Sequence, residues 1–291
     1  MNDVNPHGLL PDATRLGPVE LNVRDLLRMT SFYVAALGLQ VQRQEPGMAA
    51  LGAGREELLR LYQTPQVPTP QRHASLYHFC LAVEKRADLG WWLRRLLDDK
   101  FELQGLVDHR MAEAIYLNDP EGNGIELNWD RPRSEWRPWA EWLAMGNGPL
   151  DVEGLLADDQ AAGPRPHLAA EARVGHIHLH VGDLATAELF FVGVLGLAKT
   201  AEVPGQAVFT SAGGYHHHFA FNVWAGRGVA PQPLGAWGLR SASLLLPTAA
   251  DVEAVRARAK KAGLPIEERP DGVLLRDPSG HAILIRLDER H

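Results

Sequence analysis

The sequence predicts an α+β fold of four β-α-β-β-β modules arranged in two tandem pairs. Stretches of alternating apolar and polar residues, which indicate half-buried strands, are followed by apolar residues at helical spacing. The chain also repeats itself, since residues 177–197 align without a gap with residues 19–39, and residues 277–284 align with residues 119–126. With the helices on one side of each sheet, the other side must be covered, so we expect curved mixed sheets that enclose a cavity.

The first module shows this pattern most clearly. Residues 19–23 alternate strictly and predict a strand, and apolar residues then recur at helical spacing until Gly38 ends the predicted helix. Further strands are expected near residues 48–51 and 58–62, which completes one β-α-β-β-β module.

The second module begins with a predicted strand at residues 76–83 and a predicted helix at residues 88–99. Its last two strands flank the sequence Asp-Pro-Glu-Gly-Asn-Gly at residues 119–124, which is dense in turn-forming residues. In the strand after this turn, alternation leaves Glu126 on the polar face.

The domain organisation follows from the repeat. We expect an N-terminal arm at residues 1–16, a first module pair at residues 17–130, and a second pair at residues 173–291. Between the pairs, residues 131–172 are rich in Trp and Pro and form a predicted linker with a short helix at residues 139–144. So many tryptophans argue against free disorder. The acidic stretch 151–159 is most simply a solvated face of this linker.

Bulk properties exclude several kinds of function. The net charge of −7 argues against a nucleic-acid partner. No apolar run has membrane-spanning length, and the first residues lack a signal-peptide pattern. The single cysteine, Cys80, excludes an internal disulfide framework and fits a reducing compartment, so we expect a cytoplasmic protein. Whether the chain forms a homo-oligomer is left open.

Equivalent positions of the modules differ in their polar residues. The first-strand position holds His78 in module two and His176 in module three, but proline or serine in the others. The last-strand position holds Glu126 in module two and leucine in module four. Two neutral imidazoles and one carboxylate on a rigid sheet suit non-haem Fe(II). The simpler alternative for Glu126 is a solvated carboxylate after a turn.

Three consecutive histidines precede the alternating residues 219–223. Alternation places His216 and His218 on the polar, cavity side of module three, on the same side as His176. Imidazoles in such a place are candidates for proton transfer near neutral pH. The alternatives are a solvated hairpin edge or an adventitious metal binder.

Two motifs carry a resemblance to a known family: Phe32-Tyr33 followed by Leu37-Gly38, and Asp119-Pro120 followed by Gly122-Asn123 and Glu126. With them the chain resembles the vicinal oxygen chelate superfamily, which includes glyoxalase I, bleomycin- and fosfomycin-resistance proteins, and extradiol ring-cleaving dioxygenases. The resemblance covers nearly everything except the arm and the linker. Three stretches are similar to the bacterial catechol 2,3-dioxygenase-like branch: residues 108–127, 174–181 and 213–218.

The resemblance implies a reaction and site residues. In extradiol enzymes a tyrosine ten residues before the ligand glutamate lies beside the substrate, and Tyr116 holds that position. His109 is close to the place of an acid–base histidine, although not at the identical offset. We therefore expect a dioxygenase that cleaves a small catechol-type aromatic with O₂, using Fe(II) held by His78, His176 and Glu126. His109 or a histidine of the run 216–218 would remove the second phenolic proton and later return it.

One departure from the family pattern matters. Extradiol enzymes usually take all three ligands from one tandem pair, and here neither pair is complete. Some superfamily members pair module one with module four and module two with module three. We expect that pairing here, because it brings His176 to His78 and Glu126 and makes the two halves mutually dependent.

Other interpretations stay open. A glyoxalase-like isomerase or lyase on Zn(II) or Ni(II) is favoured if a fourth ligand comes from His216 or His218. A metal-free binding or resistance protein would use the cavity to sequester an aromatic compound. Ligand types alone do not separate Fe(II) from Mn(II), and ordinary packing is the simpler role for His109 and Tyr116.

Overall fold

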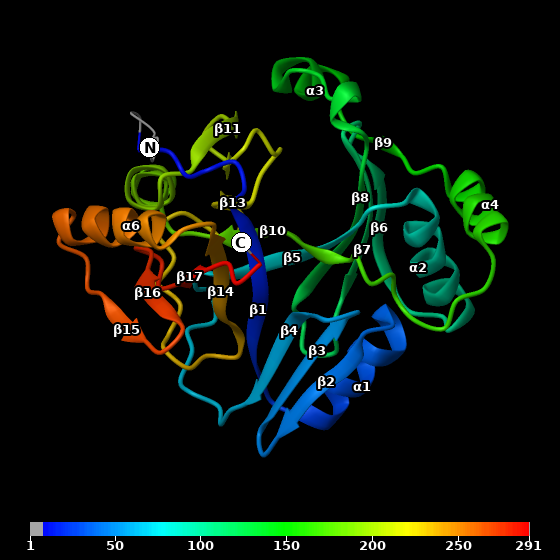
Figure 1. Ribbon diagram of the computed structural model, residues 1–291, viewed down its shortest axis with the longest axis horizontal. Coiled ribbons are helices and arrows are strands. Elements are labelled where there is room, and N and C mark those ends of the chain that lie inside the picture. The colour runs from blue at the N-terminus through cyan, green and yellow to red at the C-terminus, as the bar shows by residue number, and fades with distance from the viewer. Residues whose placement is uncertain (1–7, 291) are drawn as a thin grey trace. The chain divides into compact units, whose positions relative to one another are not determined.

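The computed structural model describes residues 8–290 of the chain (Figure 1). Module one consists of β1 (Arg15–Val23), α1 (Leu26–Leu37), β2 (Gln40–Glu45), β3 (Met48–Ala53) and β4 (Glu56–Gln63). Module two consists of β5 (Ser75–Val83), α2 (Arg86–Asp98), β6 (Leu103–Asp108), β7 (Ala112–Asn118) and β8 (Gly124–Asp130). Both modules have the predicted order.

The second half repeats this order. Module three consists of β10 (Arg173–His180), α5 (Leu184–Glu188), the π-helical turn η2 (Leu189–Leu195), β11 (Ala198–Val203), β12 (Ala207–Ser211) and β13 (Phe219–Asn222). Module four consists of β14 (Gly238–Leu246), α6 (Ala249–Lys261), β15 (Glu267–Arg269), β16 (Gly272–Arg276) and β17 (Ala282–Leu287). The predicted α+β class with four β-α-β-β-β modules is confirmed.

The repeated turn has the same geometry in modules two and four. In module two, Asp119 Oδ1 accepts hydrogen bonds of 2.9 Å from the backbone N–H groups of Glu121 and Asn123. In module four, Asp277 Oδ1 accepts from the corresponding N–H groups two and four residues later, at 2.9 and 2.8 Å. The buried aspartate therefore stabilises the turn that leads into the last strand of each module, which explains why the Asp-Pro sequence recurs.

The chain divides into two compact bodies. Among the described residues, body 1 contains 8–22, 65–77 and 176–290, and body 2 contains 23–64 and 78–175. In body 1 the strand orders are β15-β16-β17-β14-β1 and β11-β12-β13-β10. The antiparallel pairing of β1 with β14 joins module one to module four, so this half of the predicted module pairing is confirmed.

In body 2 the strand orders are β4-β3-β2 and β5-β8-β7-β6-β9. Helix α1 packs on β3 and β4, and α2 packs on β8 (Figure 1).

The predicted end of α1 is confirmed, because Gly38 is left-handed with φ 67° and its N–H bonds to the carbonyl of Val34. A side chain at Gly38 would also collide with the Trp91 ring, since a Cβ there would lie 2.3 Å from it. Glycine is therefore required twice over at this position.

The segment between the module pairs is more ordered than a linker. It contains η1 (Arg133–Glu135), α3 (Trp139–Met145), the short strand β9 (Gly148–Pro149) and α4 (Val152–Ala162). The expected short helix corresponds to α3. The expectation that the acidic stretch 151–159 is a solvated face is wrong for Asp159, which is buried and bonds to Arg94 Nε at 2.5 Å. An arginine neutralises the carboxylate, so α4 packs against α2 instead of lying free.

The domain limits drawn from the sequence stay a prediction. Residues 1–7 of the expected N-terminal arm lie outside the described residues, and β1 begins at Arg15. Within residues 8–290, none of the helices combines the length and apolar character needed to cross a membrane.

Candidate metal and proton-transfer site

His78 and Glu126 lie side by side on two neighbouring strands of body 2. β5 and β8 are parallel, and their register sets Glu126 opposite Cys80, two residues after His78. The side chains meet across this step, with His78 Nε2 3.0 Å from Glu126 Oε2. Both side chains are buried. The two predicted ligands of module two are therefore brought together.

This pair fits a divalent metal ion. A ligand nitrogen and a ligand oxygen at about 2.1 Å from one ion, at right angles to each other, lie about 3 Å apart. The distance of 3.0 Å between His78 Nε2 and Glu126 Oε2 matches that spacing. A neutral imidazole and a carboxylate are also donors that Fe(II), Mn(II), Zn(II) and Ni(II) all accept. A buried carboxylate with an imidazole beside it is not the solvated surface residue of the simpler alternative.

Tyr116 on the next strand, β7, forms a hydrogen-bonded pair with His109 in the turn between β6 and β7. Tyr116 is the register partner of Glu126 in the antiparallel pairing of β7 with β8, and its ring lies 5.7 Å from that of His78 between centroids. The Tyr116 hydroxyl is 2.8 Å from His109 Nε2. His109 Nδ1 is 3.0 Å from Asn147 Oδ1. Asn147 follows α3 in the segment taken for a linker, and no sequence pattern had marked it.

A second histidine group lies in body 1. His176 on β10, His216 and His217 each offer a ring nitrogen, and these atoms all lie within 4.8 Å of one another. The ring centroids of His176 and His217 are 4.1 Å apart. The Nδ1 atoms of His216 and His217 are 2.7 Å apart, so one ring donates its N–H to the other. All three side chains are buried, and three imidazoles at these distances are a candidate metal group of their own.

His218 is placed differently from His216. Its Nδ1 accepts a hydrogen bond of 3.2 Å from the backbone N–H of Ala212. Strand alternation does not apply to the three histidines, because β13 begins only at Phe219. Alternation therefore singled out His216 and His218, although the ring of His217 lies nearer to that of His176 than the ring of His216 does.

One amide fixes the two remaining histidines of β10. Asn222 Nδ2 is 2.9 Å from His178 Nε2, and Asn222 Oδ1 is 2.7 Å from His180 Nδ1. The ring of Tyr77, the residue before His78 on β5, lies 5.1 Å from His178 and 4.9 Å from His180 between centroids. The start of β5 therefore packs on the end of β10.

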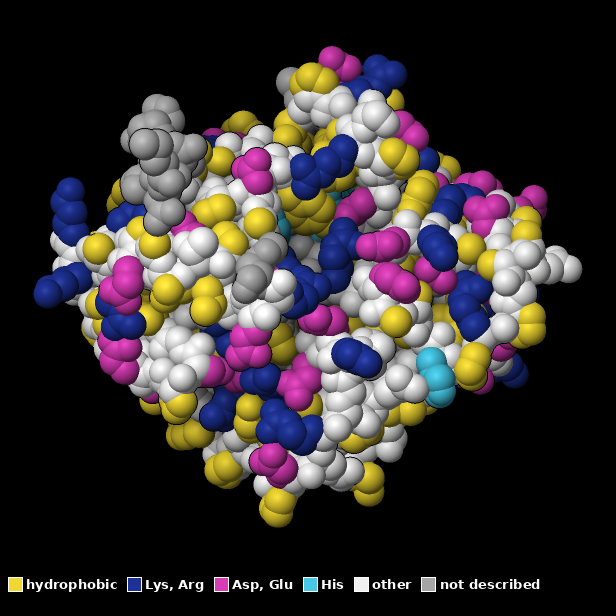
Figure 2. All heavy atoms as spheres, in the orientation of Figure 1, with side chains coloured by type: hydrophobic (Ala, Val, Ile, Leu, Met, Phe, Trp, Pro, Cys, Tyr) yellow, Lys and Arg dark blue, Asp and Glu magenta, His cyan; other side chains and the backbone are white. Residues whose placement is uncertain are grey.

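The face drawn in Figure 2 has no large patch of only positive or only negative side chains. Lysine and arginine side chains alternate there with aspartate and glutamate, and few histidines are visible. The scarcity of histidines fits the burial of His78, His176 and the run 216–218. The histidines that could bind a metal ion are interior residues, whereas His109 is half-buried.

Comparisons with known proteins identify the family of the chain. The model of the Glyoxalase/Bleomycin resistance protein/Dioxygenase superfamily matches residues 15–127 and 173–285. The chain is 39% identical over 276 residues to a catechol-2,3-dioxygenase of Bacillus subtilis, a match that covers 93% of this chain and 96% of that protein. A biphenyl-2,3-diol 1,2-dioxygenase of Rhodococcus globerulus is 29% identical over 120 residues, covering 40% of this chain and 63% of that protein.

Solved structures show the same fold. A Bacillus subtilis protein superposes with a TM-score of 0.66 at 14% identity, covering 94% of this chain and 85% of that one. Glyoxalase I of Zea mays superposes with a TM-score of 0.58 at 17% identity, covering 94% and 92%. The four β-α-β-β-β modules and these structural neighbours place the chain in the vicinal oxygen chelate fold class. The chain belongs to the Glyoxalase/Bleomycin resistance protein/Dioxygenase superfamily.

Proposed function

We propose that the protein is an extradiol ring-cleaving dioxygenase that opens a catechol-type aromatic with O₂. The observation that carries the proposal is the buried His78–Glu126 pair with Tyr116 opposite Glu126 on the adjoining strand. The identity of 39% to a catechol-2,3-dioxygenase, over nearly the full length of both chains, supports the same reaction.

The proposed metal ligands are His78, Glu126 and His176, with Fe(II) as the ion. Two contacts support the inclusion of His176. The β1–β14 pairing joins module one to module four, which is half of the pairing that this ligand set requires. The ring of Tyr77, next to His78 in the sequence, packs on His178, which is two residues after His176.

In the proposed reaction, the side chains of the protein orient the substrate and transfer protons. A bound Fe(II) ion would hold both substrates and supply the one-electron chemistry that O₂ needs to react with a closed-shell ring. Tyr116 hydrogen-bonds a substrate oxygen, and His109 Nε2, 2.8 Å from the Tyr116 hydroxyl, accepts the proton that leaves the second phenol group and later returns it. Both oxygen atoms of O₂ enter the product, so no external reductant is required.

One observation favours a second function. His216 and His217 lie close enough to His176 to add a further nitrogen ligand. A more closed ligand shell of this kind suits Zn(II) or Ni(II) and leaves less room for both a substrate and O₂. The corresponding activity is that of a glyoxalase-like isomerase or lyase.

Metal analysis combined with oxygen consumption tests the proposal. Untagged protein purified without oxygen is analysed for bound metals, beside the variants Glu126→Gln, His176→Ala and His217→Ala. His167→Ala is the matched control, because His167 is an exposed histidine outside both groups. We expect about one iron or manganese ion per chain in the wild type and control, and loss of that ion in Glu126→Gln and His176→Ala.

The outcomes separate the candidate functions. Loss of metal in Glu126→Gln and His176→Ala, together with oxygen uptake by the wild type on addition of catechols, supports the dioxygenase. Bound Zn(II) or Ni(II) that is lost in His217→Ala, together with no oxygen uptake by the wild type, supports the isomerase. Absence of metal from the wild type even after reconstitution would instead support a binding protein.

A further inference from the structure

Both nitrogens of the His109 ring have a partner in body 2. His109 Nε2 lies 2.8 Å from the Tyr116 hydroxyl, and His109 Nδ1 lies 3.0 Å from Asn147 Oδ1. Asn147 lies between the two stretches that the superfamily model matches, residues 15–127 and 173–285. The contact with Asn147 is therefore made by a segment outside the shared modules.

The Asn147 contact decides which nitrogen of His109 carries the proton. A carbonyl oxygen accepts hydrogen bonds and cannot donate them, so Nδ1 is the protonated nitrogen of the neutral ring. Nε2 then has a lone pair directed at the Tyr116 hydroxyl. In the opposite tautomer Nε2 carries the proton, so it has no lone pair that could accept a proton from the Tyr116 hydroxyl.

We propose that Asn147 is a positioning residue that holds His109 in the Nδ1–H tautomer, with Nε2 as the proton acceptor for Tyr116. This inference rests on the proposed dioxygenase function for its catalytic meaning. The segment between the module pairs would thus set the protonation of His109, and no residue of the modules would do so in its place.

The backbone around Asn147 is held against the hairpin that carries His109. Strand β9 pairs with the end of β6, with Asp108 opposite Gly148. Arg110 Nε donates to the Gly146 carbonyl at 3.3 Å. The Arg110 guanidinium also lies close over Gly148, since a Cβ there would lie 2.8 Å from it. Arg110 therefore lies against the residues on both sides of Asn147.

Tryptophans pack the same segment onto the start of β7. Trp142 of α3 forms a buried cluster with Met111 and Ala112, and Trp136 and Trp139 pack against it. Met111 and Ala112 directly follow the turn that presents His109. The tryptophans of the supposed linker therefore fix α3, and with it the approach to Asn147, on the hairpin.

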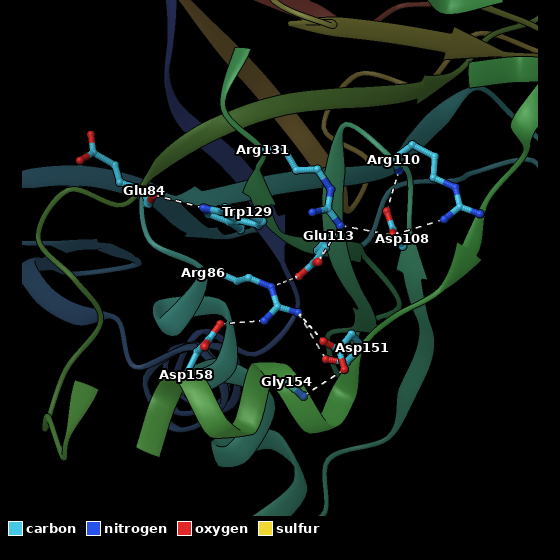
Figure 3. A network of polar contacts seen from close by, with 10 residues as sticks. All are labelled: Glu84, Arg86, Asp108, Arg110, Glu113, Trp129, Arg131, Asp151, Gly154 and Asp158. Carbon is cyan, nitrogen blue, oxygen red and sulfur yellow. Dashed lines mark hydrogen bonds and ion pairs between the residues drawn. The ribbon is translucent and has the colours of Figure 1, made fainter. Parts of the chain in front are cut away.

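An ion-pair network ties the far end of the segment to the same hairpin (Figure 3). Arg86 bonds to Glu113 at 2.7 Å, and also to Asp158 at 2.7 Å and Asp151 at 3.3 Å on the α4 side. Arg131 bonds to the other oxygen of Glu113 at 2.7 Å and reaches Asp108 at 3.2 Å (Figure 3). Glu113 is buried, so two arginines satisfy one interior carboxylate and anchor the segment on both sides of Asn147.

Nitrogen-15 NMR of histidine-labelled protein measures the tautomer directly. Protonated and unprotonated imidazole nitrogens have well-separated shifts, and His109→Gln identifies the His109 signals. We expect Nδ1–H in the wild type, a shift of the population toward Nε2–H in Asn147→Ala, and recovery of Nδ1–H in Asn147→Asp, whose carboxylate can also only accept. Asn118→Ala, at an exposed asparagine of β7, is the control.

Kinetics supply a second readout. Asn147→Ala should lower kcat for catechol cleavage by about 10-fold to 100-fold, the range for loss of a residue that orients a catalytic group, with metal content unchanged and KM altered little. Asn147→Asp should restore most of kcat. Unchanged His109 shifts in Asn147→Ala, or equal loss of kcat in both variants, would overturn the proposal. If no catechol is cleaved by the wild type, the dioxygenase proposal fails, and the NMR result still decides whether Asn147 sets the tautomer.

Discussion

The hydroxyl of Tyr33 donates a hydrogen bond of 2.6 Å to Asp119 Oδ2 in the interior of body 2. The bond joins helix α1 of module one to the β7–β8 turn of module two. Burial, followed by the nearby Asp119 carboxylate, raises the pKa of the Tyr33 phenol well above its ordinary value. Burial also raises the pKa of Asp119, although hydrogen bonds from Tyr33 and Asn123 oppose this effect. Two residues of the family motifs therefore have a structural role, because they connect successive modules.

Tyr33→Phe should destabilise the protein by about 1–3 kcal/mol, because it leaves a buried acceptor without its donor. Urea unfolding measures the change. A double-mutant cycle with Asp119→Asn isolates the pair, and we expect a coupling energy of about 1 kcal/mol or more. Additive effects of the two substitutions would show that the hydrogen bond does not contribute to stability.

The ion pair between Arg15 and Asp288 should make stability depend on pH in the acid range. Arg15 Nη2 bonds to Asp288 Oδ1 at 2.7 Å. Burial tends to raise the pKa of Asp288, but the hydrogen bonds from Arg15 and from the Arg290 backbone, together with the charges of both arginines, outweigh burial and lower the pKa below its ordinary value. Because the folded-state pKa is lowered, the stabilisation is complete above the unfolded-state pKa of about 3.9 and is lost as the pH falls through the folded-state value.

Asp288→Asn should therefore reduce the free energy of unfolding at pH 7 and have a smaller effect at pH 3, which lies below the unfolded-state pKa. Denaturant unfolding at pH 3, 5 and 7 checks this, with Asp98→Asn, at an exposed aspartate of α2, as the control. A difference between wild type and Asp288→Asn that stays constant across this range would contradict the linkage.

Helices α2 and α4 approach each other closely at Gly90. A Cβ added to Gly90 would lie 2.2 Å from the carbonyl oxygen of Leu155, so Gly90→Ala must push α4 away. We expect a loss of about 1–3 kcal/mol in the free energy of unfolding, as for other overpacked sites. Gly193→Ala is the matched comparison, because a Cβ there meets nothing within 4 Å. That variant should be neutral or slightly stabilising, since alanine favours helices over glycine.

The three consecutive histidines should differ in their importance for catalysis. The His217 ring lies beside that of His176, with 4.1 Å between ring centroids, whereas the Nδ1 of His218 bonds to the Ala212 amide. On the proposed function, His217→Ala should lower kcat by about 10-fold to 100-fold, the range for loss of a group that supports a metal ligand, and His218→Ala by less than about 10-fold. Steady-state oxygen consumption with a catechol measures both. The reverse order would show that His218, and not His217, supports the proposed ligand His176.

Periodicity in the sequence predicted the module order, because half-buried strands and one-sided helices repeat their apolar residues at fixed spacings. It also predicted that His78 and Glu126 lie on the polar faces of their strands, since alternation fixes the face of each residue. Periodicity did not predict the positions of residues outside helices and strands. His217 lies before β13, so its orientation depends on a loop, and Asn147 depends on tertiary contacts of a segment without periodicity. Asp159 looked solvated because its neutralising partner, Arg94, lies 65 positions away.

The pairing of β1 with β14 has a consequence for the synthesis of the chain. Arg15 is the register partner of Leu245, and at roughly 5–20 residues per second the ribosome completes the second strand about 10–50 s after the first. During that interval β1 has an open edge toward its missing neighbour, which is the kind of edge that recruits other chains. The nascent first half must therefore be shielded until most of the polypeptide has been synthesised, and a polypeptide that stops before residue 238 would keep that edge open permanently.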